Sequence, residues 1–137
     1  MLGGIDIPHS RGLEGWSDAD AVAHAVIDSL CGAAGLGDIG TQFPSGDERY
    51  RGVSSVQLLS SVAGMVRERG FGIVNVDVTV VAEEPILAPY VTEMRRSLAI
   101  PMGVGSDRVS IKAKTNEHMG FVGRGEGVAV FAVALLE

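Results

Sequence analysis

The chain has 137 residues, of which 46% are hydrophobic and 20% are charged, and its formal net charge at pH 7 is −6. This length predicts a single domain over residues 1–137, and the hydrophobic fraction excludes an intrinsically disordered chain and favours an oligomer that covers surplus apolar surface. The acidic balance excludes a nucleic acid as partner, because nucleic-acid binding depends on clustered Lys and Arg.

Three features predict the compartment. Cys31 is the only cysteine, so no disulfide within the chain is implied. The first residues resemble neither a signal peptide nor an Arg-rich transit segment, and no apolar stretch has the length of a membrane span. We therefore expect a cytoplasmic protein with no membrane partner.

The predicted elements begin with a short edge strand over residues 2–7 and a helix over 18–35. Ser17 opens this helix in a capping-box pattern, and apolar residues follow it at helical spacing. A second helix over 54–69 has the same periodicity and ends at Gly70.

The second half of the chain predicts most of the sheet. Residues 73–81 alternate β-branched apolar with short polar side chains, and 108–114 and 128–136 are further strands. A third helix over 87–99 should end before Pro101, whose ring disfavours helix continuation. This order predicts an α+β fold, an α/β sandwich in which about three helices cover one face of a mixed sheet. Packing of the other face in a closed cyclic assembly would cover the surplus apolar surface.

The first long helix carries a candidate metal ligand. Asp20, His24 and Asp28 are four residues apart and project from one helix face. A histidine paired with an aspartate on a solvated face is the alternative, and spacing alone favours it. A metal needs three or four ligands, and His9 and His118 lie at no recognisable spacing from His24.

A glycine-rich stretch, residues 120–127, is a candidate phosphate site. It follows Lys112, Lys114 and Thr115 and contains Arg124, so exposed N–H groups and cations could meet phosphate oxygens. Its spacing matches neither the dinucleotide fingerprint nor the P-loop. A plain glycine-rich hairpin is equally compatible.

The segment 36–47 is a second candidate loop. It is rich in Gly and Pro, and it contains two aspartates just beyond a predicted helix end. Loops of this kind often carry function, although a simple connection would have the same composition.

Taken in order, these segments resemble the 2-C-methyl-D-erythritol 2,4-cyclodiphosphate synthase family over almost the whole chain. The family's helix motif, its flexible substrate loop and its glycine-rich C-terminal motif all have counterparts here, and the last is the most specific. The matching residues are Ser17-Asp18-Ala19-Asp20 with His24 and Asp28, Leu36-Gly37-Asp38-Ile39-Gly40 with Phe43-Pro44, and Gly120-Phe121 with Gly123-Arg124-Gly125-Glu126-Gly127.

The resemblance implies a homotrimer with active sites between neighbouring subunits. It implies a phosphorus-oxygen lyase of non-mevalonate isoprenoid biosynthesis, which converts 4-diphosphocytidyl-2-C-methyl-D-erythritol 2-phosphate to 2-C-methyl-D-erythritol 2,4-cyclodiphosphate and releases CMP. It also implies a divalent metal, zinc, with magnesium or manganese on the substrate diphosphate. Such a reaction needs positioning and charge neutralisation more than a nucleophilic side chain, because the attacking oxygen is the substrate's own.

Carried over by position, His24 is a metal ligand, and Thr115 and Trp16 are the catalytic residues. Trp16 and Ser17 also occupy a substrate-contacting place. The expected loop over the methylerythritol part comprises Asp38, Ile39, Gly40, Phe43, Pro44, Ser45, Gly46 and Asp47. The expected surround of the cytidine and its phosphates comprises Ala82, Glu83, Glu84, Pro85, Ile86, Leu87, Ala88, Lys114, Thr115, Asn116, Glu117, Phe121 and Arg124.

Three positions depart from the family pattern. The family begins with a strand ending in Asp-x-His, which supplies the first two metal ligands, and Met1 falls after that motif. We therefore expect either a start further upstream or a truncated chain with impaired metal binding. Trp16 stands where the family more often has a histidine, and its one neutral N–H weakens an electrostatic role there. Ser45 stands where an aspartate is common.

Two hypotheses remain at this stage. The first is an active synthase, and the second is a non-catalytic trimer that binds cytidine nucleotides or isoprenoid diphosphates. The missing ligands and Trp16 motivate the second. The first is favoured by a set of residues that a structural relic has little reason to combine: His24, Asp38, Thr115, Glu117 and Arg124. Without the resemblance, the residues support only a phosphate-binding α/β domain.

Overall fold

The computed structural model describes residues 1–9 and 19–137. Its sheet has three strands in the order β2-β1-β3, with β1 (Ile73–Val81) in the centre. β1 is parallel to β2 (Val109–Lys114) and antiparallel to β3 (Ala129–Leu136). Val78 pairs with Ile111 on one side and with Ala132 on the other. The strands predicted over 73–81, 108–114 and 128–136 are confirmed to within one residue.

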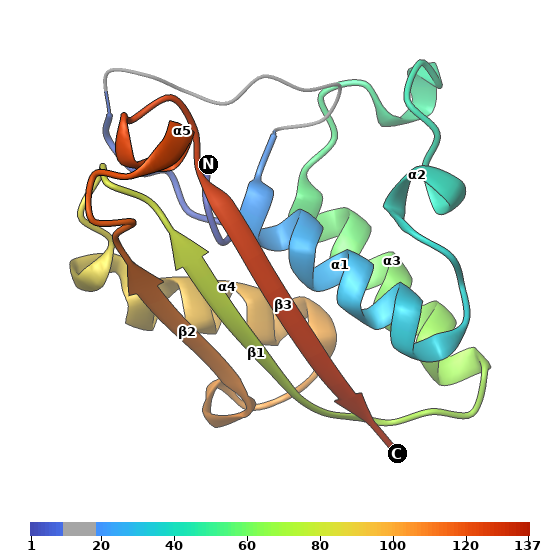
Figure 1. Ribbon diagram of the computed structural model, residues 1–137. Helices are drawn as coiled ribbons and strands as arrows, with labels where there is room; N and C mark the ends of the chain where they lie inside the picture. Colours follow the sequence, from blue (N-terminus) through green and yellow to red (C-terminus); the bar gives the residue numbers. More distant parts are fainter. Residues whose placement is uncertain (10–18) are drawn as a thin grey trace.

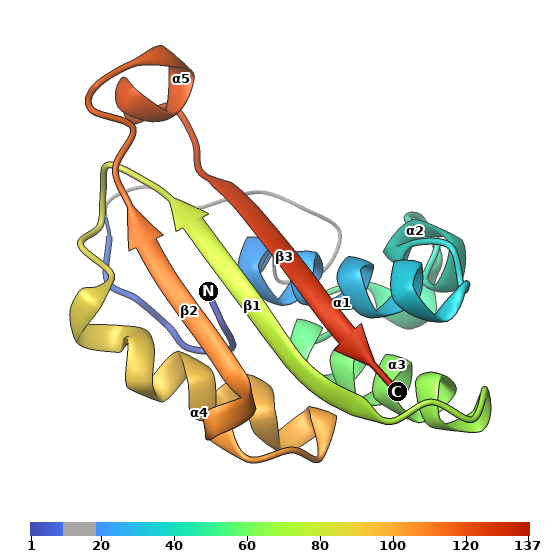
Figure 2. The ribbon, with the colours of Figure 1, turned by 60° about the horizontal axis from the view of Figure 1, so that its bottom comes forward.

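Three long helices lie on one side of this sheet, as Figures 1 and 2 show. They are α1 (Ala21–Ala34), α3 (Ser55–Glu68) and α4 (Val91–Met102). Two single-turn helices, α2 (Ile39–Gln42) and α5 (Gly120–Gly123), lie in the connecting segments, and 3₁₀ turns span Glu48–Tyr50, Ala88–Tyr90 and Ser106–Arg108. This arrangement confirms the α+β fold. No helix among the described residues is long and apolar enough to cross a membrane.

The core lies between the sheet and the helices. In β1 the side chains of Val76, Val78 and Val80 are buried. The intervening Asn75 and Asp77 are exposed, as the period of a strand with one covered face requires. Leu30, Leu59 and Leu98 from the three long helices are fully buried in the same hydrophobic core as these valines. Truncation of such a leucine to alanine typically costs about 2–5 kcal/mol.

The opposite face of the sheet is polar on two strands and apolar on the third. Lys112 of β2 and Asp77 of β1 form an exposed ion pair with 2.8 Å between Nζ and Oδ2. On β3 the side chains of Phe131, Val133 and Leu135 are 65%, 71% and 55% exposed. We refer to these three residues as the β3 apolar strip.

Asp20 connects the start of the chain to α1. Its carboxylate accepts hydrogen bonds from the backbone of Ala23 at 2.9 Å, Gly3 at 2.8 Å and Gly4 at 2.6 Å. It is therefore the N-cap of α1, which begins at Ala21 rather than at 18, and Ser17 lies outside the described residues.

Two further predictions about the elements were wrong. Residues 2–7 form no strand of the sheet, because Gly3 and Gly4 have positive φ and turn the chain so that Leu2 pairs with Ile5. The third helix begins at Val91 and passes through Pro101 to Met102. Pro101 is tolerated because it lies in the last turn, where its missing N–H removes only one hydrogen bond before Gly103 ends the helix.

Candidate functional site

The predicted site residues form two groups in this chain. One follows the carboxyl end of α1 and includes α2, and the other lies at the carboxyl ends of β1 and β2 beside α5. α2 and α5 lie at opposite sides of the molecule in both views (Figures 1 and 2). Trp16 and Ser17 lie outside the described residues.

The first group is a surface loop stabilised mainly by its own aspartates. Asp38 caps α2, because its carboxylate accepts from the backbone N–H and the hydroxyl of Thr41, both at 2.8 Å. The backbone hydrogen bond from Thr41 is the main reason that the pKa of Asp38 lies below its ordinary value. The carboxylate of Asp28 on α1 accepts from the N–H of Ile39 at 2.8 Å and so docks the loop on the helix.

The rest of this loop, residues 43–47, leads from α2 to the 3₁₀ turn Glu48–Tyr50. Phe43 is half-buried, and its ring meets the Tyr50 ring edge-on at a centroid distance of 5.2 Å. Asp47 caps the following 3₁₀ turn and pairs with Arg49 at 2.7 Å, and this pairing lowers the pKa of its carboxyl group. Gly40 and the three residues Pro44, Ser45 and Gly46 are exposed. The loop therefore offers short polar groups and open backbone to a ligand.

His24 lies one turn into α1 and is half-buried. Its Nε2 atom is 2.8 Å from the hydroxyl of Ser55, which is fully buried at the start of α3. Asp20 caps the helix and Asp28 docks the loop, so the helix face predicted from their spacing serves structural hydrogen bonds. In the part of the chain that the structure describes, no group of three or more His, Cys, Asp or Glu residues could hold a metal ion.

The second group begins where β1 ends. Ala82 is buried and donates its N–H to the carbonyl of Lys114 at 2.9 Å, which continues the parallel pairing one residue beyond the strands. Glu83 follows, and its Oε1 accepts from the N–H of Asn116 at 2.8 Å and of His118 at 3.1 Å. Because parallel strands end at the same edge, the segments that follow β1 and β2 start side by side, with Ala82 and Glu83 bonded to residues 114–118.

The side chains of this second group differ in exposure. A cis peptide bond joins Glu84 to Pro85. Ile86 is 76% exposed, whereas Leu87 is buried. The exposed members, whose side chains are open to a ligand, are Glu84, Ala88, Lys114, Thr115, Glu117, Phe121 and Arg124.

The glycine-rich stretch forms α5 and the turn into β3, and therefore not a plain hairpin. At Gly123 a Cβ atom would overlap the carbonyl carbon of His118 and lie 2.7 Å from its Cα, so only glycine allows this close approach. Arg124 follows and forms a two-pronged pair with Glu126, with distances of 2.9 Å from Nε and 3.2 Å from Nη2. The guanidinium plane is thereby oriented at the surface.

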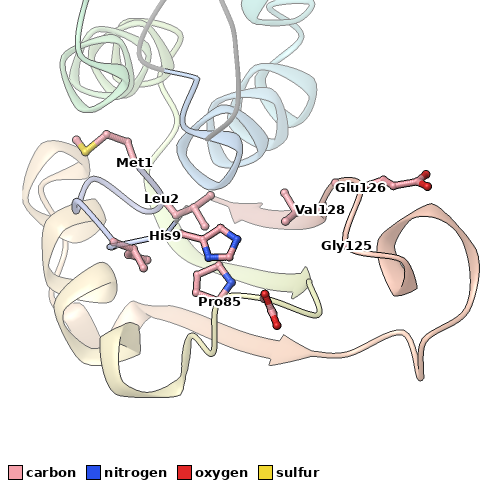
Figure 3. Close-up of a pocket in the computed structure, with 10 residues that line it drawn as sticks. Met1, Leu2, His9, Pro85, Gly125, Glu126 and Val128 are labelled. Atoms are coloured by element: carbon pink, nitrogen blue, oxygen red, sulfur yellow. The ribbon is translucent and has the colours of Figure 1, made fainter. Parts of the chain in front are cut away.

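Two adjoining cavities open beside this group. One has a volume of about 170 Å³ and lies between the N-terminal residues, the Glu84–Pro85 turn and the segment 125–128 (Figure 3). The other, about 300 Å³, is lined by His9, Glu83, Glu84, His118, Gly123, Arg124 and Gly125. His9 and His118 were not predicted as site residues. The position of His118 directly after Glu117 is the one signal that could have indicated His118, and no signal indicated His9.

Comparisons with known proteins agree with this geometry. The model of the YgbB family matches residues 1–137. A 2-C-methyl-D-erythritol 2,4-cyclodiphosphate synthase from Dehalococcoides mccartyi is 56% identical over 137 residues, which are 100% of this chain and 87% of that protein. The synthase of the same name from Symbiobacterium thermophilum is 57% identical over 136 residues, with 99% and 87% covered.

Solved structures give the same result. A 2C-methyl-D-erythritol-2,4-cyclodiphosphate synthase in its CDP-bound form matches with a TM-score of 0.90 and 34% identity, over 100% of this chain and 89% of that one. The bifunctional IspDF from Campylobacter jejuni matches with a TM-score of 0.94 and 38% identity, over 99% of this chain and 37% of that one. The chain therefore belongs to the YgbB family, the family of the 2-C-methyl-D-erythritol 2,4-cyclodiphosphate synthases.

Proposed function

We propose that this protein converts 4-diphosphocytidyl-2-C-methyl-D-erythritol 2-phosphate to 2-C-methyl-D-erythritol 2,4-cyclodiphosphate and CMP, as a step of non-mevalonate isoprenoid biosynthesis. The proposal is supported by a family match that extends from residue 1 to residue 137. It is supported equally by relatives above 50% identity that bear the name of this synthase.

The observation that carries the proposal is the edge of the sheet where β1 and β2 end. There the exposed Arg124 lines a polar cavity of about 300 Å³, and the exposed Lys114 and Thr115 lie at the end of β2. Lysine and arginine side chains and a hydroxyl group are suited to a diphosphate, because they supply positive charge and hydrogen-bond donors to its oxygens. Residues 82–88 lie beside them and offer backbone groups to a pyrimidine base.

In the proposed reaction, an oxygen of the 2-phosphate attacks the β-phosphorus of the diphosphate. A new P–O bond closes the ring, the bond from the β-phosphorus to the bridging oxygen breaks, and its electron pair leaves with CMP. No bond to the protein forms, so the enzyme acts as a phosphorus-oxygen lyase through positioning and electrostatics. Lys114 and Arg124 neutralise the phosphates, and the Thr115 hydroxyl donates to the diphosphate. Phe121 and Asn116 to Glu117 complete the cytidine side, and Trp16 and Ser17 are further proposed contacts.

We also propose a homotrimer in which the loop of one subunit covers the sheet edge of the next. Two observations support this. The loop 38–47 and the sheet edge lie at opposite sides of one chain, so a shared substrate requires a second copy. The β3 apolar strip leaves three large side chains in solvent unless another subunit covers it.

The family implies a divalent metal, and we propose zinc with His24 as one ligand. The described residues do not by themselves fit this metal, since one imidazole is not a zinc site and no ligand cluster accompanies His24. We therefore derive no step of the reaction through it. Elemental analysis of the wild type and of His24→Ala tests the assignment: zinc that is present in the first and lost in the second would support it, and a wild type without zinc would contradict it.

The function is tested by incubating the purified protein with the diphosphocytidyl substrate. We expect CMP release in proportion to enzyme, with a cyclic diphosphate as the phosphorus-containing product in the ³¹P NMR spectrum. Binding of CDP without turnover would instead identify the non-catalytic binder. Hydrolysis to an open-chain diphosphate would contradict the cyclisation.

A further inference from the structure

The turn after β2 has an unusual backbone. Glu117 and His118 both have positive φ, 51° and 61°, a conformation that residues with a Cβ atom seldom adopt and that glycine adopts readily. Two such residues in succession require strong external hydrogen bonding to persist. The same turn presents Thr115 and Glu117, which the proposed function places against the substrate.

The hydrogen bonds that fix this turn come from Glu83, more than thirty residues earlier in the chain. A single oxygen, Oε1, accepts from the N–H of Asn116 at 2.8 Å and of His118 at 3.1 Å. Contacts within the turn join neighbouring residues: the side-chain amide of Asn116 donates to the carbonyl of Met119 at 2.7 Å, and the backbone N–H of Met119 donates to the carbonyl of Asn116 at 2.9 Å. Glu83 therefore accepts hydrogen bonds on both sides of Glu117, from the residue before it and the residue after it.

The environment of Glu83 argues against direct contact with the substrate. Its side chain is only 10% exposed, and its carboxylate is turned toward the backbone of the neighbouring segment. A negative charge facing a diphosphate would also oppose binding. Glu83 also lines the cavity of about 300 Å³, but its Oε1 atom is held by two backbone N–H groups, whereas its neighbour Glu84 is exposed and lines both cavities.

We infer that Glu83 is a positioning residue, which holds segment 115–118 in the shape that binds the cytidine nucleotide without touching the nucleotide itself. The inference rests on the proposed function and refines the earlier expectation that Glu83 contacts the substrate. Because both N–H groups meet the same oxygen, the carbonyl oxygen of a glutamine could accept both. The two backbone hydrogen bonds need an acceptor at this point, which glutamine also supplies, while the second oxygen, Oε2, lies 3.9 Å from Nδ1 of His118.

Three variants of the full chain test this inference. Glu83→Ala removes the acceptor, Glu83→Gln keeps it, and Glu68→Gln changes an exposed glutamate at the end of α3 as a matched control. We would measure CDP affinity by titration calorimetry, kcat and KM for CMP release, and amide hydrogen exchange of Asn116 and His118 by NMR.

We expect Glu83→Ala to raise the dissociation constant of CDP and the KM by about tenfold or more, and to speed exchange of both amides by a similar factor, because two hydrogen bonds to a charged acceptor are lost. Glu83→Gln and Glu68→Gln should stay within about threefold of the wild type. Equal damage from Gln and Ala would overturn the inference, as would unchanged CDP affinity in Glu83→Ala.

If Glu83→Ala does not fold, amide exchange in the wild type alone still tests the inference. Fast exchange of the Asn116 and His118 amides in the wild type would overturn it. A different observation would show that the proposed function is wrong: the wild type would release no CMP. The comparison of amide exchange between the variants would still test the role of Glu83 in that case.

Discussion

The two groups of site residues are built in opposite ways. In the loop 38–47 the caps join residues two or three positions apart, such as Asp38 to Thr41 and Asp47 to Arg49, and one longer bond, from Ile39 to Asp28, joins the loop to α1. At the sheet edge the decisive bonds join residues 33 and 35 positions apart, from Glu83 to Asn116 and His118. The loop can therefore change shape without loss of the core, whereas the sheet edge is as rigid as the strands that end there.

The largest effect should come from the cation of the rigid region. Arg124→Ala should lower kcat/KM for CMP release by about 10²–10³-fold, because a preorganised positive group is lost from the phosphate site. Arg124→Lys should recover only part of the loss, since an ammonium group cannot reproduce the two-pronged pair with Glu126. Steady-state kinetics would check both. An unchanged Arg124→Ala enzyme would remove Arg124 from the site.

The second test compares how much stability each region loses when a methyl group is added at a glycine. Gly123→Ala should destabilise the protein by about 1–3 kcal/mol, because the new methyl group meets the backbone of His118 and neither segment can yield. Gly40→Ala in α2 places its methyl group 3.5 Å from Asp38, an ordinary contact, and should change stability by less than about 0.5 kcal/mol. The free energy of unfolding of both variants can be measured by urea titration. Equal losses of stability in the two variants would contradict the difference in rigidity between the two regions.

A smaller effect is expected where the loop is docked. Asp28→Ala removes the acceptor for the N–H of Ile39 and should raise KM by roughly tenfold. It should leave the unfolding midpoint and CDP affinity nearly unchanged, because the bond is exposed and lies away from the sheet edge. Asp28→Asn, which keeps an acceptor, should behave like the wild type. A comparable loss of CDP affinity in Asp28→Ala would mean that the two regions are coupled within one chain.

The smallest effect concerns pH. The hydrogen bonds from His118 and then Asn116 lower the pKa of Glu83 below its ordinary value of 4.5, so its stabilising contribution is present above that pH and is lost as the pH falls through the lowered pKa. For Asp38 the same loss begins below its ordinary value of 3.8. Glu83→Gln should therefore flatten the fall of the unfolding free energy that begins near pH 4.5. A slope identical to that of the wild type would contradict the assigned hydrogen bonds.

Most of the fold could be predicted because its signals are local. The alternation in 73–81 and the apolar stripe of 54–69 gave β1 and α3 to within a residue at each end. The prediction of an edge strand over 2–7 was wrong because two glycines with positive φ turn the chain. The predicted end of α4 was wrong because Pro101 lies in the last turn, where its missing N–H removes only one backbone hydrogen bond.

The site was less predictable, because its contacts are between distant residues. Nothing near Glu83 in the sequence indicates that its carboxylate accepts hydrogen bonds from the backbone N–H groups of Asn116 and His118. The resemblance named residues 82–88 and 114–117 together, and its assignment of Glu83 to the substrate stays a prediction. The role of Trp16 and Ser17 stays a prediction, since both lie outside the described residues.

The β3 apolar strip also affects how the protein must be handled. β3 carries no charged residue over Ala129–Leu136, and among the described strands it lies at an edge of the sheet. An uncharged edge strand with exposed Phe, Val and Leu side chains is a template for pairing with other chains and for fibril growth. In the proposed homotrimer this strand would be covered, so dilution that dissociates the proposed trimer should expose it. Light scattering normalised to protein concentration should then rise on dilution, and its rise would measure how much colloidal stability depends on covering β3.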